Sequence, residues 1–133
     1  MVQSAAQRPL IGHPLYQRGL ELYGAGHFFE CHEVLEELWS PMRGPHRLYL
    51  QALIHFAVAF YHLERRNPLG AERQLRKALR KLRAYLPVYQ GVDTAALYQE
   101  GQACLETIIA GGTPSPPLLR HAPSFQAPPA SLC

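Results

Sequence analysis

The chain is poor in cysteine and contains no long apolar run. Its three cysteines are far apart and form no C-x-x-C pair, which argues against a disulfide framework and against a thiolate zinc site. The longest nearly apolar run, ALIHFAVAFY, is much shorter than the roughly 20 residues that a membrane-spanning helix needs. The N-terminal residues hold no apolar stretch of signal-peptide length. We therefore expect a soluble, cytoplasmic protein that does not enter a membrane.

Lysine is also scarce, since only Lys77 and Lys81 accompany the arginines. This bias assigns no function by itself. The formal net charge of +3 is too small to indicate a nucleic-acid partner from the total alone. A length of 133 residues is enough for one domain with a single hydrophobic core.

No segment alternates apolar and polar residues as a strand does, whereas helix start and stop signals recur along the chain. Proline or an N-capping residue precedes several of the apolar-periodic segments, and glycine or proline follows them. The sequence therefore predicts an all-α fold, a compact bundle of about five helices over residues 14–23, 27–39, 45–66, 67–86 and 93–111.

The composition changes at both ends of this helical domain, which we predict to span residues 14–112. Residues 1–13 are expected to form a flexible lead. Residues 113–133 carry six of the twelve prolines and few charges, so we expect a mostly disordered tail. Leu118, Leu119 and Phe125 are the tail residues that could dock on the domain.

The second predicted helix contains the stretch FFECHEVLEELW, with one histidine and four glutamates in an otherwise apolar run. His32 and Glu36 are four residues apart and share a helix face near the border between core and solvent. A neutral imidazole and a carboxylate at this spacing can chelate one zinc, iron or manganese ion. The alternative is a hydrogen bond between the two side chains without a metal.

The third predicted helix is apolar nearly all round, which is typical of a central, buried helix. Its strongly polar members Gln51, His55 and His62 fall within an arc of roughly 40°. This stripe either faces solvent or faces the second helix. In the second case His62 would meet His32 and Glu36, and three protein ligands with an open position are typical of catalytic metal sites.

The spacing H-x-x-x-E-x-x-W, formed by His32, Glu36 and Trp39, resembles a bacterial and archaeal family known as domain of unknown function 309. The stretch YHLERRNPLGAERQLRKALRKL, which contains His62, is also similar to that family. The resemblance covers roughly residues 14–86. It implies a small all-helical protein of unsettled activity whose motif binds a metal ion. His55 is a weaker correspondence, and the Pro-rich tail lies outside the resemblance.

Together, the spacing and the resemblance lead to one hypothesis, in which a divalent metal ion is bound by His32, Glu36 and His62. Around these ligands, His55 and Gln51 are candidates for orienting the ligands, and Trp39 is a candidate wall of the site. If the protein is an enzyme, metal-assisted hydrolysis with Glu33 as the general base is the class we expect.

Two other readings stay open. Residues 65–83 hold eight basic residues and one acid, so the fourth helix has a basic face that is either solvated or able to contact phosphates. Nucleic acid is not the expected partner, since no aromatic residue interleaves this face. A helical interaction module similar to tetratricopeptide hairpins, without metal or catalysis, is the main alternative. A small molecule or a protein is a conceivable partner, and a homodimer that buries part of the third helix is compatible with its apolar composition.

Overall fold

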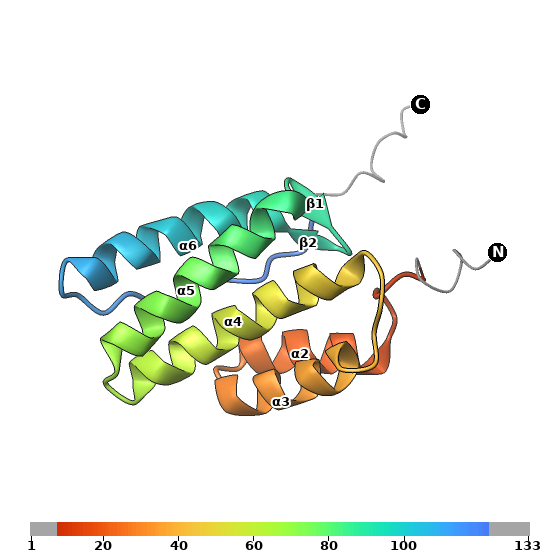
Figure 1. The fold of residues 1–133 in the computed structure, drawn as a ribbon, viewed down its shortest axis with the longest axis horizontal. Helices are drawn as coiled ribbons and strands as arrows, with labels where there is room; N and C mark the ends of the chain where they lie inside the picture. Colours follow the sequence, from red (N-terminus) through yellow and green to blue (C-terminus); the bar gives the residue numbers. More distant parts are fainter. Residues whose placement is uncertain (1–7, 123–133) are drawn as a thin grey trace.

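The computed structural model describes residues 8–122, and within this range the chain forms an all-α bundle of five α-helices (Figure 1), as predicted. The helices follow one another with short connections, in the order α2 (Pro14–Gly24), α3 (Phe28–Trp39), α4 (His46–Glu64), α5 (Pro68–Leu82) and α6 (Thr94–Ile109). A single 3-10 turn, η1 (Arg83–Tyr85), prolongs α5. Two short strands, β1 (Val88–Tyr89) and β2 (Val92–Asp93), then lead into α6.

The helix starts coincide with the signals in the sequence. Pro14 opens α2 in the first turn, where its missing N–H costs nothing. Asn67 caps α5, because its side-chain oxygen accepts a hydrogen bond from the Gly70 N–H at 3.0 Å. Asp93 caps α6 through the Ala96 N–H at 2.9 Å. Each cap satisfies a backbone donor that the first helical turn leaves without an intrahelical partner.

The β1–β2 hairpin was not predicted. Val88 pairs with Asp93 and Tyr89 with Val92 in an antiparallel register, and the turn between them uses positive φ angles at Gln90 and Gly91. The sequence predicts the turn, but a strand of two residues is too short to show alternation.

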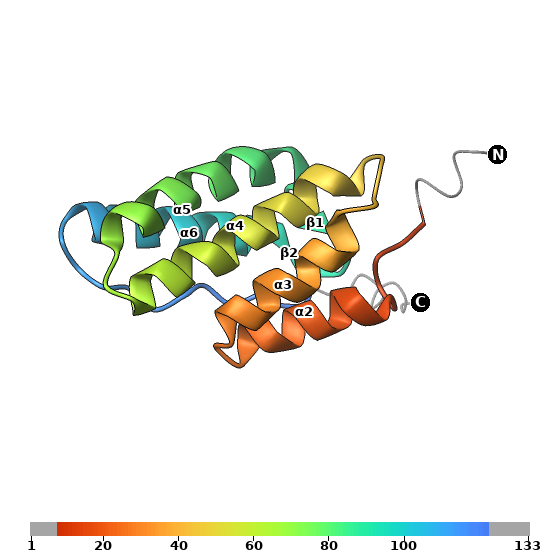
Figure 2. The same ribbon diagram turned by 60° about the horizontal axis from the view of Figure 1, so that its bottom comes forward.

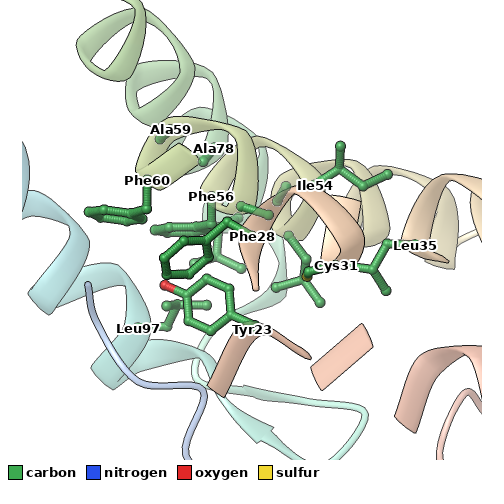
Figure 3. Close-up of a cluster of buried hydrophobic side chains, with 14 of the residues drawn as sticks. Tyr23, Phe28, Cys31, Leu35, Ile54, Phe56, Ala59, Phe60, Ala78 and Leu97 are labelled. Atoms are coloured by element: carbon green, nitrogen blue, oxygen red, sulfur yellow. The ribbon is translucent and has the colours of Figure 1, made fainter. Parts of the chain in front are cut away.

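The hydrophobic core is built around α4, which packs against both α3 and α5. Figures 1 and 2 show α4 between these two helices. Phe28 of α3 and Phe56 and Phe60 of α4 meet in this core together with Tyr23 of α2 and Leu97 of α6 (Figure 3). In the described part of the chain, no helix combines the length and the apolar character needed to cross a membrane.

The first part of the Pro-rich tail is ordered. Residues 113–122 run back along the bundle, where the Tyr23 hydroxyl donates to the Pro117 carbonyl at 2.8 Å. Further along, the Asp93 N–H donates to the Arg120 carbonyl at 2.9 Å. The predicted disorder is therefore not confirmed for residues 113–122. Residues 123–133, including Phe125, lie outside the described residues.

The N-terminal segment also reaches into the fold before Pro14. Leu10 is buried, and its N–H donates to the side-chain oxygen of Gln90 at 2.7 Å. The buried His46 ring donates from Nε2 to the Arg8 carbonyl at 2.7 Å. Its Nδ1 then accepts from the Tyr89 hydroxyl at 2.6 Å. Packing therefore begins within the segment that the sequence suggested as a flexible lead.

Candidate functional site

The amphipathic pattern of α3 sets the position of His32. Cys31, Leu35 and Leu38 are buried on one side of the helix. The side chain of His32 is 22% exposed and that of Glu36 is 51% exposed. Both residues therefore lie at the border between core and solvent, where the sequence placed them.

The hydrogen bonds of His32 determine which ring nitrogen carries the proton. Nδ1 lies 3.2 Å from the carbonyl oxygen of Phe29. A carbonyl oxygen only accepts, so Nδ1 donates, and the neutral ring has its free lone pair on Nε2. This Nε2 lies 3.4 Å from Oε1 of Glu36. Two acceptors face each other at this distance, and they attract each other only when a proton or a metal ion lies between them.

His62 of α4 shares a small hollow with His32. The hollow has a volume of about 160 Å³ and a mostly apolar wall, lined by Phe28, Phe29, His32, Val58, Tyr61 and His62. Two imidazoles from different helices therefore border one space, as the contact between the second and third predicted helices required. Glu36 does not line this hollow.

The ring of His62 is held by the residue that caps the next helix. Nδ1 of His62 lies 3.3 Å from Nδ2 of Asn67, while the amide oxygen of Asn67 accepts from the Gly70 N–H. The amide nitrogen therefore donates to Nδ1, which leaves the proton of a neutral His62 ring on Nε2. In this arrangement neither ring nitrogen of His62 has a free lone pair for a metal.

The three predicted ligands do not form a ready coordination sphere. Within residues 8–122, no group of three or more His, Cys, Asp or Glu side chains is placed so that it could hold a metal ion. The structure brings His32 next to Glu36 and into the same hollow as His62. A three-ligand site would require a side-chain rearrangement, with the ring of His62 released from Asn67.

His55 lies in a different environment from the one suggested by the polar stripe. Its Nδ1 donates to Oε1 of Gln74 at 2.8 Å, and its Nε2 accepts from Nζ of Lys81 at 2.8 Å. Burial lowers the pKa of His55, and the nearby Lys81 charge lowers it further against the opposing effect of Gln74. His55 and His62 are seven positions apart, which corresponds to roughly 10 Å along the helix axis. His55 therefore belongs to the contact between α4 and α5.

The other predicted site residues also lie outside the hollow. Gln51 is half-buried one turn before His55, and Glu33 is exposed on α3. The ring of Trp39 packs under the guanidinium of Arg47, 4.0 Å from the ring centroid. Arg47 also donates to the carbonyl oxygen of Trp39 at 3.1 Å, which satisfies an acceptor at the end of α3. The position of Trp39 thus indicates a role in joining α3 to the start of α4.

Phe29 and Tyr61 are wall residues that sequence reasoning missed. Their ring centroids are 5.2 Å apart, and the Phe29 ring lies 5.4 Å from the His32 ring. Residues three apart on a helix are neighbours, so the spacing of Phe29 and His32 was a usable signal. Tyr61 offered none, because its proximity depends on how α4 packs against α3.

A larger cleft of about 440 Å³ lies between the turn joining α2 to α3, the end of α4 and the C-terminal segment. Phe60, Leu63 and Pro117 are among the residues that make its wall mostly apolar. Its size is in the range of small-molecule pockets. Of the predicted site residues, none lines it, so it is separate from the His32–Glu36 pair.

Comparisons with known proteins find a matching family and one similar uncharacterised protein. The sequence profile of the family described as "Domain of unknown function (DUF309)" matches residues 16–74. The "Uncharacterized protein YpuF" of Bacillus subtilis (strain 168) is 36% identical over 93 residues, which are 67% of this chain and 53% of that protein. The chain therefore spans about half the length of this relative. No solved structure matches the chain.

The matched range contains α3, α4 and the first half of α5, and with them His32, Glu36, Trp39 and His62. These are the residues on which the resemblance was based. Through residues 16–74 the chain belongs to the family described as domain of unknown function (DUF309).

Proposed function

We propose that this chain binds one divalent transition-metal ion at His32 and Glu36, with His62 as a third ligand. One observation carries the proposal, namely the two acceptors, Nε2 of His32 and Oε1 of Glu36, that face each other at 3.4 Å. The hydrogen bond from Nδ1 to the Phe29 carbonyl fixes the tautomer that a metal-binding imidazole needs. Imidazole and carboxylate suit zinc, iron and manganese.

The third ligand requires a local change at the junction of α4 and α5. His62 becomes a ligand when its ring leaves Asn67 and turns a free lone pair toward the hollow that it shares with His32. Asn67 keeps its capping bond to Gly70 during this change, so α5 does not have to unfold. The cost is one exposed hydrogen bond, which is small beside the gain from a metal–nitrogen bond.

A metal ion bound by three protein ligands supplies a Lewis acid and can lower the pKa of a bound water. The positions of the chain's own residues do not support a particular metal-assisted reaction. Glu33 is exposed and does not line the hollow, so its position gives no support to a role as general base. The proposal is therefore confined to metal binding, with the apolar wall of Phe28, Phe29, Val58 and Tyr61 limiting the access of water to the ion.

The experiment is a titration of metal-free protein with Zn²⁺, Co²⁺ and Mn²⁺. Calorimetry monitors the binding of each ion, and absorption reports bound Co²⁺. We expect one ion per chain for the wild type and loss of binding in His32→Ala and Glu36→Gln. Glu37→Gln is the matched control, because Glu37 is an exposed carboxylate on the same helix. Circular dichroism verifies that each variant is folded. Absence of binding by the wild type, or equal binding by all variants, would overturn the proposal.

A further inference from the structure

Helix α4 presents a half-exposed stripe on the side of the bundle that faces away from the core. Its members recur at intervals of three or four residues and therefore share one helix face, namely Leu48, Gln51, His55, Val58 and His62. Because α4 lies between α3 and α5 (Figures 1 and 2), this stripe is the middle of a broader surface with α3 on one side and α5 on the other. We call it the α3–α4–α5 face.

The two flanking helices carry opposite charges of equal size. Helix α3 contains four exposed glutamates and no lysine or arginine, a net charge of −4: Glu30, Glu33, Glu36 and Glu37. Helix α5 contains one acid, Glu72, and five basic residues, a net charge of +4: Arg73, Arg76, Lys77, Arg80 and Lys81. Such a surface attracts a partner that places a basic edge against α3 and an acidic edge against α5.

These charges are not neutralised between the two helices. The ion pairs of α3 are made with histidines, His27–Glu30 and His32–Glu36, and the ion pair of α5 is Arg76–Glu72 within the same helix. Among the ion pairs of residues 8–122, none joins α3 to α5. Glu33, Glu37, Arg73 and Lys77 are exposed and take part in none of these ion pairs. The face therefore has a free acidic edge and a free basic edge.

From this charge pattern we infer that the α3–α4–α5 face binds a second copy of the chain, with a two-fold axis parallel to α4. Rotation about that axis places α3 of one copy against α5 of the other, twice per dimer, and sets the two α4 stripes facing each other. A two-fold axis lying across α4 would instead place α3 on α3 and α5 on α5. Like charges would then oppose each other, so the pattern selects one of the two orientations.

Exposed apolar side chains on the same face supply the non-polar contact that an interface core needs. Phe29 is 46% exposed and Leu48 is 50% exposed, and Val58 is half-buried between His55 and His62. Aromatic and aliphatic side chains surrounded by charged edges are the usual arrangement of a protein interface. Two copies in the selected orientation cover these side chains while pairing the acidic and basic edges. Glu33, Glu37, Arg73 and Lys77 are not among the proposed metal ligands, so substitutions there test the dimer without removing a ligand.

The test is a charge exchange followed by mass measurement in solution. One variant carries Glu33→Lys and Glu37→Lys, and the other carries Arg73→Glu and Lys77→Glu. The first variant takes the net charge of α3 from −4 to 0, and the second takes that of α5 from +4 to 0. In each variant alone, the substituted side chains also have the sign of the helix that they would oppose. We therefore expect a monomer, or a dimer weakened at least about tenfold. In a heterodimer of the two variants, the unchanged α3 of one opposes the unchanged α5 of the other, and the new lysines oppose the new glutamates. We therefore expect a mixture in equal amounts to form a heterodimer of about twice the 15.0 kDa chain mass.

Light scattering after size exclusion and sedimentation velocity supply the masses, and circular dichroism of each variant verifies folding. The heterodimer itself is a second control, because a misfolded variant would not regain association on mixing. The measurements are made with chelator and again with added zinc, so that failure of the metal proposal does not affect the result. A wild type that stays at 15.0 kDa at high concentration, a dimer unaffected by either variant, or variants that stay monomeric on mixing would each overturn the inference.

Discussion

Nε2 of His32 lies 3.4 Å from Oε1 of Glu36, although the other nitrogen of the ring already donates to the carbonyl of Phe29. The local helix geometry of α3 creates this relationship, since residues 29, 32 and 36 follow one another along one face. The pair is thus pre-oriented by its own helix. What distinguishes it from an ordinary surface contact is that a neutral imidazole has no proton left to donate to the carboxylate.

Replacing Glu36 by glutamine tests the carboxylate as a metal ligand while keeping the size of the side chain. Glutamine keeps the size of glutamate, but its amide oxygen is a much weaker ligand for a transition metal. We expect Glu36→Gln to lower metal affinity by at least about tenfold. The free energy of unfolding of the metal-free protein should change by less than about 0.5 kcal/mol, because the side chain is half-exposed. Competition with a coloured chelator measures the affinity, and unchanged affinity would remove Glu36 from the site.

Asn67 offers a test of the third ligand. In Asn67→Asp the carboxylate still caps α5 through the Gly70 N–H, but it can no longer donate to Nδ1 of His62. A carboxylate there instead accepts from Nδ1–H, which leaves the lone pair of His62 on Nε2. We therefore expect Asn67→Asp to bind metal more tightly than the wild type. Calorimetric titration of both proteins decides the matter, and weaker or equal binding would argue against His62 as a ligand.

The matched control for that variant is Asn67→Ser, which keeps an N-capping hydroxyl without a carboxylate. We expect it to melt close to the wild type and to gain less affinity than Asn67→Asp. Asn67→Ala removes the cap and should destabilise the protein by about 1 kcal/mol. Comparing the three variants separates the effect on His62 from the effect on α5, with urea unfolding as the measure of stability.

The environment of His55 predicts how stability depends on pH. Burial lowers the pKa of His55 in the folded protein below its ordinary value of 6.5. As pH falls through that value, the unfolded chain binds a proton more readily than the folded one, so the folded state loses stability. The contribution is complete above pH 6.5 and decreases below it. The positive charges of α5 lower the pKa of His55 further, because a protonated His55 would lie near Lys77, Arg80 and Lys81.

We therefore expect His55→Gln to lose less stability than the wild type between pH 7 and pH 5, since glutamine does not titrate. Glutamine can still bond to Gln74 and Lys81, so the packing of α4 against α5 is retained. His121→Gln is a suitable control, because His121 is exposed and makes no side-chain hydrogen bond within residues 8–122. Urea unfolding at several pH values gives the comparison, and parallel pH profiles for the wild type and His55→Gln would contradict the prediction.

The features that sequence predicts well are those set by neighbouring residues. Pro14 marks the start of α2 through its restricted backbone, and Asn67 and Asp93 mark helix starts through capping bonds to residues three positions ahead. The His32–Glu36 pair follows from the geometry of a single helix turn. All of these depend on local backbone geometry, so they hold whatever the tertiary fold.

Features that depend on packing between distant segments were not predictable in the same way. His55 and His62 share a stripe, but only the placement of α3 and α5 on opposite sides of α4 directs one to Lys81 and the other to the hollow. The bond between His62 and Asn67 depends on the turn at Arg66, whose φ is 59°. Proline-rich composition suggested a disordered tail, yet Pro117 is buried through contacts with residues far earlier in the chain.

The contact between Tyr23 and the tail provides the last prediction. The Tyr23 hydroxyl is buried and donates to the Pro117 carbonyl at 2.8 Å, across 94 residues of sequence. Tyr23→Phe removes the donor and leaves a buried carbonyl without its partner, so we expect a loss of about 1–3 kcal/mol in the free energy of unfolding. Tyr98→Phe, at a half-buried tyrosine outside this contact, is the control. Urea unfolding gives the free energies. Equal stability of the two variants would mean that residues 113–118 do not hold to the bundle in solution.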